Sequence, residues 1–287
     1  MKIILAKEIG FCLGVKRALK IVKDNLPKLK KPIKMYGALV HNEEVTKKLK
    51  KEGIEIINNP REIKTGTLII TAHGLAPKIK AKLKRKKGLS FIDTTCPFVT
   101  LVQKKAEFLH KKNKKVLIFG DPNHQEVLGI KGAAKEKAII FSSQKELLGL
   151  KLQKTQKYGL VSQTTQNFEE FKKMVEEVIQ VKFPQIEIFN TICETSFKRQ
   201  TEIRELAKKV DLVLMVGSFT SANTKRLHQI SLSINPKSFF IRTVKDLKKE
   251  WLCGIKSIGI GSGASTPDWV IKAIVRQIKK LDPKNYT

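Results

Sequence analysis

Three of the four cysteines in this chain are spread almost evenly along its 287 residues. Cys12 and Cys96 are 84 residues apart, Cys96 and Cys193 are 97 apart, and one third of the chain is about 96 residues. This spacing predicts three similar units that each present one thiol to a common centre. Three cysteines can hold zinc with a histidine or a water as fourth ligand, or a four-iron cluster with one open iron. The three thiols by themselves do not distinguish a zinc site from an iron–sulfur cluster.

The residues before two of these cysteines repeat. Phe91-Ile-Asp-Thr-Thr-Cys96 and Ile188-Phe-Asn-Thr-Ile-Cys193 share an apolar pair, then Asp or Asn, then Thr, one residue and Cys. Cys253 lies outside any such context, so we expect it to be a packing residue. The chain contains no C-x-x-C, and its few, widely spaced cysteines argue against a zinc ribbon, a redox dithiol and a disulfide scaffold.

Three histidines, His41, His73 and His124, follow short apolar runs. One histidine in such a position is usually structural, but three beside the distributed cysteines indicate one polar active centre. Imidazoles donate hydrogen bonds to phosphate oxygens, and charge-assisted bonds of this kind contribute about 1.5–3 kcal/mol each. His110 and His228 lie in charged helical stretches, and we expect them at the surface.

One pattern recurs along the chain: a short apolar run with β-branched residues, a polar turn, and then a helical period. The predicted strands are 2–6, 67–71, 116–119, 159–161, 212–216 and 258–260, and the predicted helices include 15–26, 98–110, 168–180, 199–209 and 267–280. This alternation is typical of α/β proteins with largely parallel sheets. The cysteine spacing divides the chain into α/β units at 1–96, 97–193 and 194–287, with the N-terminal strand able to join another unit.

Clusters of Ser, Thr and Asn follow several of these strands, for example at 162–165, 217–223 and 261–265. In open α/β sheets ligands bind at the carboxyl ends of the strands, where helix N-termini favour anions. Each polar residue alone could be a helix cap, but together they predict a phosphate or diphosphate pocket. A nucleotide site is not supported, because neither a P-loop nor a G-x-G-x-x-G follows a strand.

The composition is that of an ordinary globular protein, with 41% apolar and 29% charged residues. The net charge is +31, yet only 8 of the 57 cationic residues are Arg. Scattered lysines of this kind favour solvated faces over base or phosphate recognition. No basic helix interleaved with aromatics and no RNA-binding motif is present, so we expect no specific nucleic-acid partner. No apolar run approaches the length of a membrane span and the N-terminus lacks a signal, so we expect a cytoplasmic protein without membrane contact.

Eight segments resemble, in order, the motifs of one enzyme family. They are Gly10-Phe-Cys-Leu-Gly-Val-Lys-Arg-Ala18, Val40-His-Asn42, Ala72-His-Gly74, Thr95-Cys-Pro97, Gln163-Thr-Thr165, Asn190-Thr-Ile-Cys193 with Arg199-Gln200, Gly217-Ser218 with Ser221–Asn223, and Gly263-Ala-Ser-Thr-Pro-Asp268. The family is 4-hydroxy-3-methylbut-2-enyl diphosphate reductase, the last enzyme of the methylerythritol phosphate route to isoprenoids. The resemblance spans residues 1 to about 275.

The resemblance implies a trefoil of three similar α/β domains around a central [4Fe-4S] cluster. Its three ligands would be Cys12, Cys96 and Cys193, and the fourth iron would be open to the substrate hydroxyl. The implied activity is an iron–sulfur oxidoreductase reaction that removes this hydroxyl and gives isopentenyl and dimethylallyl diphosphate. It needs electrons, and the positive field would attract an acidic electron donor such as ferredoxin or flavodoxin.

The resemblance also assigns residues to the substrate. Those expected to surround the diphosphate and the allylic alcohol are His41, His73, His124, Thr164, Ser221, Asn223 and Ser265. Glu126 is expected to be the catalytic proton source. The competing interpretation of Glu126 is a carboxylate that merely favours the dipole of a helix N-terminus.

Some positions depart from the family pattern. Gln125 stands where the family usually has Pro, Ala222 replaces a usual Ser, and Glu194-Thr195-Ser196 differs from the usual x-Ala-Thr. These differences affect single contacts, since the three thiols, the three histidines and the glutamate remain. Quinolinate synthase is also a trefoil with three cysteines on one cluster, but the contexts of the histidines and the glutamate argue against it.

Overall fold

In the computed structural model the described residues are 1–59, 62–153, 155–180 and 185–281. They form two compact units. The first comprises Met1–Lys16, Val40–Lys48 and Glu194–Thr287, and the second comprises Arg17–Leu39 and Leu49–Cys193. Within the described ranges, no helix is both long and apolar enough to cross a membrane.

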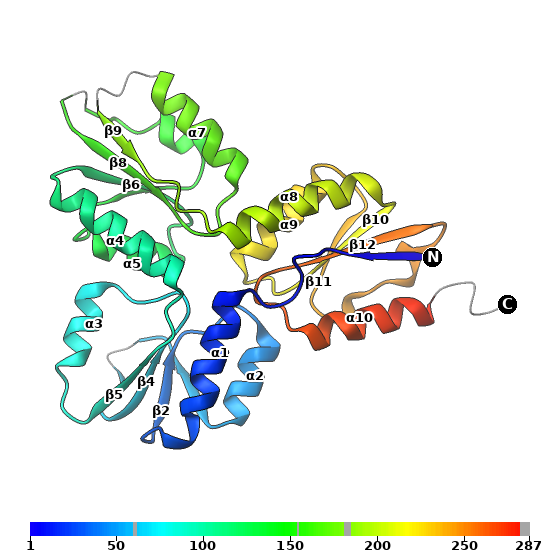
Figure 1. Cartoon of the computed structure of the whole chain (residues 1–287), viewed down its shortest axis with the longest axis horizontal. Helices are drawn as coiled ribbons and strands as arrows, with labels where there is room; N and C mark the ends of the chain where they lie inside the picture. Colours follow the sequence, from blue (N-terminus) through cyan, green and yellow to red (C-terminus); the bar gives the residue numbers. More distant parts are fainter. Residues whose placement is uncertain (60–61, 154, 181–184, 282–287) are drawn as a thin grey trace. The chain divides into compact units, whose positions relative to one another are not determined.

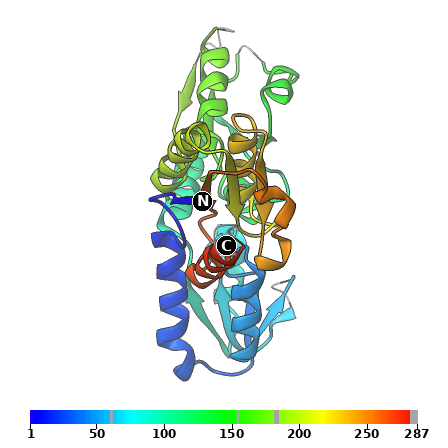
Figure 2. The same ribbon diagram turned by 90° about the vertical axis from the view of Figure 1, so that its right-hand side faces the viewer.

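In the described part of the first unit, four parallel strands form a sheet in the order β1 (Lys2–Leu5), β12 (Ser257–Ser262), β10 (Leu212–Val216) and β11 (Ser238–Ile241). Helices α8 (Glu194–Lys209) and α9 (Ala222–Leu232) pack on one face, and α10 (Asp268–Lys280) packs on the other (Figures 1 and 2). Short 3-10 helices span Val244–Asp246 and Lys249–Leu252. Successive residues of β10 therefore serve two apolar cores, one on each face of the sheet.

The second unit contains two parallel sheets, each of four strands among the described residues. One has the order β3 (Ile54–Ile57), β2 (Ile33–Tyr36), β4 (Gly66–Ile70), β5 (Leu89–Asp93), and the other β7 (Ile139–Phe141), β6 (Lys115–Phe119), β8 (Tyr158–Ser162), β9 (Ile186–Ile188). Helix α3 (Pro77–Lys84) packs on the first of these sheets. Helices α4 (Pro97–Lys111) and α5 (Gln125–Ala133) cover one face of the other, with α6 (Gln144–Leu148) and α7 (Phe168–Gln180) on its opposite face (Figure 1).

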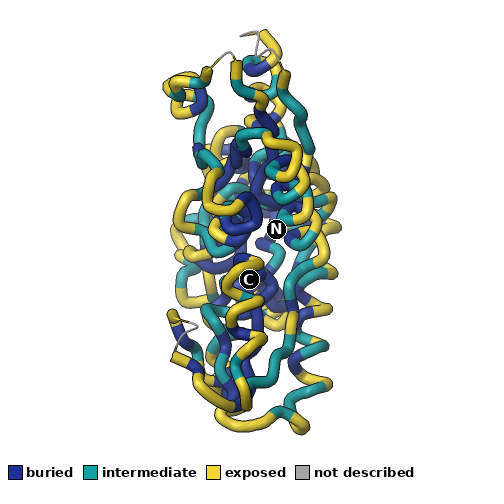
Figure 3. Tube along the Cα trace, turned by 90° about the vertical axis from the view of Figure 1, so that its left-hand side faces the viewer, coloured by how far each residue is buried: buried dark blue, intermediate teal, exposed yellow. Residues whose placement is uncertain are grey.

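Helices α1 (Leu13–Asn25) and α2 (Glu43–Lys51) contain residues of both units, and a 3-10 helix follows α1 at Leu26–Lys28. The helices bury one side only, as the alternation of blue and yellow within single helices shows (Figure 3). In α4, for example, Val102, Ala106 and Leu109 are fully buried, and they recur at the spacing of one helix face.

The three sheets share one strand topology. In the two sheets of the second unit, the chain forms a central strand, its outer neighbour, the second central strand, and finally the edge strand beside that second central strand. In the second unit this sequence is β2 to β5 and again β6 to β9. In the first unit β10, β11 and β12 follow the same path, and β1 from the start of the chain takes the edge position beside β12. The same α/β arrangement therefore occurs three times.

The α/β class and the parallel pairing predicted from the sequence are confirmed. The predicted strands agree with β1, β4, β6, β8, β10 and β12 to within two residues at each end. Strands β2, β3, β5, β7, β9 and β11 were not indicated by the apolar pattern, because they have three to five residues and many of their positions are only half-buried. Helix α8 begins at Glu194, five residues before its predicted start.

One expectation about a single residue is wrong. Cys253 is not a packing residue, because it is exposed at the C-terminal end of the 3-10 helix Lys249–Leu252. His110 and His228 are helical as expected, but both are half-buried. The Nε2 atom of His228 lies 3.1 Å from the Ser238 carbonyl oxygen, which ties α9 to β11.

Gly159 of β8 lies where α4 approaches the sheet closely. A Cβ atom on Gly159 would lie 2.4 Å from Cδ2 of the fully buried Leu109. We expect Gly159→Ala to lower the free energy of unfolding by about 1–3 kcal/mol, as overpacking of a core typically does. Adding Leu109→Ala should cost less than the sum of the two single changes, because it makes room for the new methyl group.

Urea unfolding followed by circular dichroism measures these losses. Gly149→Ala is the matched control, because its Cβ would lie 3.5 Å from the nearest backbone oxygens, and its effect should stay within about 0.5 kcal/mol. A loss for Gly159→Ala no larger than that of the control would contradict the prediction.

Candidate active site

The backbone N–H groups of the three evenly spaced cysteines donate hydrogen bonds to equivalent carbonyl oxygens. Each acceptor lies two residues beyond the end of a central strand, and each cysteine follows the edge strand beside it. The pairs are Cys12 with Ala264 after β12, Cys96 with Ala72 after β4, and Cys193 with Thr164 after β8, each at 3.0 Å. The three thiols therefore occupy the same position in three equivalent sheets.

The surroundings of these thiols fit a metal or a metal cluster. All three are half-buried, and each cysteine directly precedes a helix, namely α1, α4 or α8. A helix N-terminus favours negative charge, and the thiolate is the form that ligates metals. At the start of α1, the Val15 N–H group donates to Cys12 Sγ at 3.4 Å. The donor set therefore suits a thiolate-ligated centre.

The repeated Asp/Asn-Thr-x-Cys pattern has a structural reason. The Thr94 hydroxyl donates to the carbonyl of Ile70 at 2.6 Å, and the Thr191 hydroxyl donates to the carbonyl of Ser162 at 2.7 Å. Ile70 and Ser162 are the last residues of β4 and β8. The preceding carboxylate or amide oxygen accepts the backbone N–H two residues on in both segments. Each threonine thus fastens the segment before the cysteine to the neighbouring strand.

The segment before Cys12 lacks this threonine and is held differently. Gly10 donates its N–H to Ser262 Oγ at 2.8 Å, and its carbonyl accepts from the buried Arg199 guanidinium at 2.8 Å. Arg199 also donates to the Ser262 carbonyl at 2.8 Å. Gly10 has φ +77°, and a Cβ there would lie 2.1 Å from the Asp268 carboxylate, so only glycine fits. Arg199 was part of a sequence motif, but its role as a clamp follows only from the structure.

The other predicted site residues stand at the carboxyl ends of the central strands. Five residues after β2, β6 and β10 come His41, His124 and Ser221, and two residues further come Glu43, Glu126 and Asn223. Two or three residues after β4, β8 and β12 come His73, Thr164 and Ser265. The parallel sheets thus place the polar turns of each unit at the edge where α/β proteins bind ligands.

In the second unit the structure brings Glu126 and Thr164 together. Glu126 is only 2% exposed, and its carboxylate accepts the Thr164 backbone N–H at 2.6 Å and the Thr164 hydroxyl at 2.9 Å. A buried carboxylate is costly unless it is hydrogen-bonded, and here both oxygens are. Glu126 does lie in the first turn of α5, where it favours the helix dipole. In addition, the two hydrogen bonds from Thr164 fix the position of the Glu126 carboxylate.

Two histidines meet in the same unit. The rings of His73 and His124 lie 5.4 Å apart, nearly perpendicular to each other. His124 caps α5, because its Nδ1 accepts the Glu126 N–H at 3.2 Å. An accepting Nδ1 leaves the proton of a neutral imidazole on Nε2, so that atom is a hydrogen-bond donor.

In the first unit Ser221, Asn223, Ser265 and His41 were predicted to bind substrate. The Ser265 hydroxyl donates to the His41 carbonyl at 3.0 Å, and Ser221 caps α9 by accepting the Thr224 N–H at 3.3 Å. The Asn223 side chain is 5% exposed, and neither its Nδ2 nor its Oδ1 has a hydrogen-bond partner among the described residues. A buried amide without partners is unfavourable and indicates a polar ligand.

Glu43 received no role from the sequence. It occupies the position after β2 that Glu126 occupies after β6, and its carboxylate accepts the Ser218 hydroxyl at 2.7 Å. The His-x-Glu spacing shared by 41–43 and 124–126 was the available signal. Unlike Glu126, however, Glu43 is exposed.

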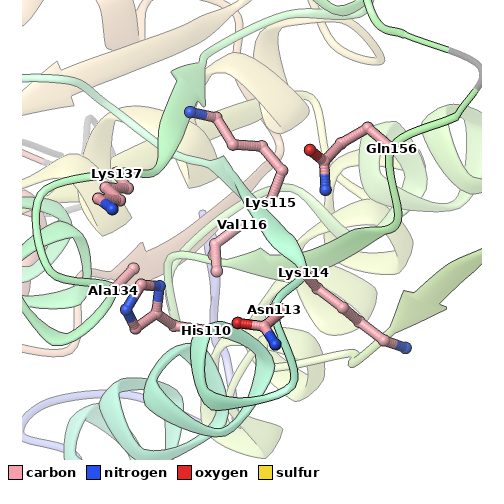
Figure 4. Close-up of a pocket in the computed structure, with 8 residues that line it drawn as sticks. All are labelled: His110, Asn113, Lys114, Lys115, Val116, Ala134, Lys137 and Gln156. Carbon is pink, nitrogen blue, oxygen red and sulfur yellow. The ribbon is translucent and has the colours of Figure 1, made fainter.

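A basic hollow of about 190 Å³ lies at the opposite end of β6 and does not belong to this site (Figure 4). Its walls include His110, Lys115 and Lys137, and Lys115 is the first residue of the strand. The Lys114 and Lys115 side chains extend in different directions, and Lys114 forms an ion pair with Glu187 at 2.6 Å. Its cations therefore do not converge on one anion.

Comparison with known proteins identifies the family. The family model described as LytB protein matches residues 3–279. The 4-hydroxy-3-methylbut-2-enyl diphosphate reductases of Campylobacter lari and Pelobacter propionicus are 41% and 38% identical to this chain, and each match covers 99% of this chain and 100% of the relative.

Solved structures agree with these sequence matches. The Plasmodium falciparum E-1-hydroxy-2-methyl-but-2-enyl-4-diphosphate reductase has a TM-score of 0.92 at 34% identity, covering 100% of this chain and 90% of that chain. A second reductase structure, described as the terminal enzyme of the non-mevalonate pathway, has a TM-score of 0.68 at 35% identity and covers 98% of this chain and 100% of its own.

Fold and family together define this chain as an α/β enzyme of the iron–sulfur oxidoreductase class. It belongs to the 4-hydroxy-3-methylbut-2-enyl diphosphate reductase family, and the resemblance that its motifs predicted is confirmed.

His41 provides a test of the electrostatics of the first unit. Burial lowers the pKa of His41 below its usual 6.5; Lys225 lowers the pKa as well, and the opposing effect of Glu43 does not offset them. We expect a neutral His41 ring at pH 7. Its contribution to stability is complete above pH 6.5 and is lost as the pH falls through the lower pKa of the folded state, because the unfolded chain binds the proton first.

An NMR titration of the imidazole signals measures this pKa, with His41→Gln to assign the resonance. A midpoint above 6.5 would show that Glu43 outweighs burial.

Proposed function

We propose that this chain reduces 4-hydroxy-3-methylbut-2-enyl diphosphate to isopentenyl and dimethylallyl diphosphate, the last step of the non-mevalonate route. The C–O bond to the hydroxyl breaks, two electrons and two protons are consumed, and the oxygen leaves as water. Family membership supports this activity. The observation that carries it is the equivalent position of Cys12, Cys96 and Cys193 after the edge strands of three equivalent sheets.

These three cysteines would hold one [4Fe-4S] cluster with one iron free of protein ligands. When bound, the cluster would supply single electrons and a Lewis acid for the leaving oxygen. A trefoil of three α/β domains, at 1–96, 97–193 and 194–287, belongs to the same proposal. Its support is that each sheet contributes one thiol, through the same backbone hydrogen bond.

The diphosphate and the allylic alcohol would be bound by His41, His73, His124, Thr164, Ser221, Asn223 and Ser265. These side chains follow central strands, where the helix N-termini of α/β sheets favour anions. The buried Asn223 amide offers both a donor and an acceptor that have no partner within the described residues. The Nε2–H group of a neutral His124 adds a further donor.

Glu126 would donate a proton during removal of the hydroxyl. The two Thr164 hydrogen bonds fix its carboxyl group and stabilise the carboxylate that remains once the proton has left. Its burial keeps bulk water from competing for that proton. The allylic skeleton can accept a proton at either of two carbons, which accounts for two products.

Two departures from the family pattern lie beside these residues. Gln125 stands between His124 and Glu126, and a Cβ atom on Gly37 would lie 2.4 Å from the Gln125 amide nitrogen, so this side chain fills the space above a glycine. Ala222 follows the capping Ser221 and removes one hydroxyl donor, while the backbone of α9 is kept. Both changes leave the Glu126–Thr164 contact in place.

The electrons would come from an acidic donor protein such as ferredoxin or flavodoxin, and the reaction would take place in the cytoplasm. A net charge of +31 supports the choice of an acidic donor, because opposite charge speeds encounter.

Removal of one ligand tests the cluster. Protein purified without oxygen should be brown and contain about four irons per chain, and Cys96→Ser should lose most of this iron, because a cluster normally requires its thiolate ligands. Iron analysis and the visible absorption spectrum measure the loss. Cys253→Ser is the matched control and should keep the cluster, since Cys253 is exposed at the end of the 3-10 helix Lys249–Leu252 and follows no edge strand of a sheet. Full iron content in Cys96→Ser would refute the ligand assignment.

The proton donor is tested by Glu126→Gln. Because a positioned general acid typically contributes about 10²–10⁴-fold, turnover should fall by about 10² or more while iron content and substrate affinity remain. Steady-state kinetics with reduced methyl viologen and binding of the substrate to the oxidised enzyme give the two readouts. Glu43→Gln changes the equivalent, exposed glutamate and should affect turnover far less. Equal turnover of Glu126→Gln and the parent would mean that another group delivers the proton.

A further inference from the structure

Helix α4 exposes apolar side chains on the flank beside the face that packs on its sheet. Phe98 is 42% exposed, Leu101 46% and Phe108 40%, and their spacing puts them on one side of the helix. The adjoining side, with Val102, Ala106 and Leu109, is buried against β6 and β8. The exposed face begins two residues after Cys96, the residue that precedes α4. We call this face, with the hollow beside it, the α4 surface.

The hollow reaches both neighbours of Cys96. It has a volume of about 540 Å³, and its walls include Thr95 and Pro97 on either side of this cysteine. Leu101 and Lys104 of α4 form another wall, together with Arg17 of α1. All of these residues belong to the second compact unit. A molecule seated in the hollow would therefore contact the residues on both sides of a proposed cluster ligand.

The hollow has an excess of positive charge. Arg17 and Lys104 are exposed, and Arg17 donates to the Thr95 carbonyl at 3.2 Å. Asp93 is the one carboxylate among the lining residues, and it forms an ion pair with Lys80. Burial alone would raise the pKa of Asp93, but the hydrogen bonds from Lys80 and Thr95 hold that pKa below its usual value. The charge of Asp93 is therefore already balanced, and those of Arg17 and Lys104 remain.

Cations and apolar groups alternate further along the helix. The Lys105 amino group lies 4.3 Å from the centre of the Phe189 ring, and the Lys112 amino group lies 4.4 Å from the centre of the Phe108 ring. The α4 surface thus combines lysines with exposed aromatic and aliphatic side chains. This combination suits a partner with acidic residues around a small apolar centre.

We propose that the α4 surface is the docking site of a small, acidic one-electron carrier protein that reduces the enzyme. The inference rests on the proposed function, since reductive removal of a hydroxyl as water consumes two electrons and two protons. Each docking event delivers one electron, so a complete reaction requires two such events. Because electron transfer weakens steeply with distance, the carrier must dock beside a cluster ligand, and the hollow lies at Cys96. The complex would be small and transient, as electron-transfer encounters usually are.

Other occupants fit less well. A second copy of the chain would carry the same charge of +31 and would be repelled. Nucleic acid would be attracted by the lysines, but it gains little from the aliphatic Leu101 beside the hollow and has no need of contact with a cluster ligand.

The test compares a protein donor with a small one, using the cluster-loaded enzyme without oxygen. The protein donor is an acidic [2Fe-2S] ferredoxin and the small donor is reduced methyl viologen. Lys104→Glu places a negative charge in the hollow, and Leu101→Gln removes its apolar wall. For each variant we expect kcat/KM for the ferredoxin to fall about tenfold, because Lys104→Glu reverses a charge that speeds association and Leu101→Gln removes apolar contact area from the interface. Turnover with methyl viologen should stay within about twofold of the parent.

Binding gives a readout that does not depend on turnover. Calorimetric titration with oxidised ferredoxin should show a Kd about tenfold weaker for Lys104→Glu, and the Kd of the parent should rise with salt. Lys137→Glu is the matched control, because it makes the same charge change in a different basic hollow of the second unit (Figure 4). It should leave both the Kd and the ferredoxin kcat/KM near the parent values.

The outcomes separate the two proposals. No turnover of the parent with methyl viologen would mean that the proposed function fails. The ferredoxin Kd values would still test whether the α4 surface is the docking site. Normal viologen turnover with unchanged ferredoxin Kd and kcat/KM in both α4 variants would overturn the docking site. Equal losses in Lys137→Glu would also overturn it, since they would show a response to net charge alone. Tighter binding of a single-stranded RNA than of ferredoxin at the α4 surface, or dimers abolished by Leu101→Gln, would assign the surface to another occupant and overturn the proposal.

Discussion

The arrangement of the site depends on one repeated hydrogen bond, from a cysteine N–H to the carbonyl two residues past a central strand. This bond fixes the backbone at each cysteine, between the end of the edge strand and the start of the following helix. In two sheets a threonine bonded to the last residue of the same strand reinforces it, and in the third Gly10 and the buried Arg199 do so. Different side chains thus hold the same backbone position, which shows that the backbone position is the conserved element of the three repeats in this chain.

Buried charge at the carboxyl edge of the sheets is the second constraint. Glu126 and Arg199 are almost fully buried, and such groups are stable only when hydrogen bonds compensate for lost water. Thr164 supplies two donors to Glu126, while the carbonyls of Gly10 and Ser262 accept from Arg199. Each bond joins a strand end to a helix or loop of the same unit. The polar groups therefore stiffen the edge at which substrate would bind, and the buried Asn223 amide is left for a ligand.

The positive charge of the chain consists of scattered exposed lysines and of a local excess near Cys96. Many lysines are exposed on helix faces, as their scattered distribution in the sequence predicts. Near Cys96 the local balance matters more than the total, because Lys80 neutralises Asp93 and leaves Arg17 and Lys104 beside exposed apolar groups. A net charge of +31 predicts attraction of acidic partners. Only the folded chain, however, brings positive charge and exposed apolar area together at α4.

The sequence by itself determined the α/β class, the main strands and helices, the three evenly spaced thiols and the family. These depend on local periodicity and on motifs, both of which are written along the chain. The tertiary structure decided the short half-buried strands, the place of β1 beside β12, the exposure of Cys253 and the contacts of Glu126 and Arg199. Apart from the exposure of Cys253, these features arise from hydrogen bonds between residues tens to hundreds of positions apart, and such pairings leave no periodic signal in any local stretch of sequence.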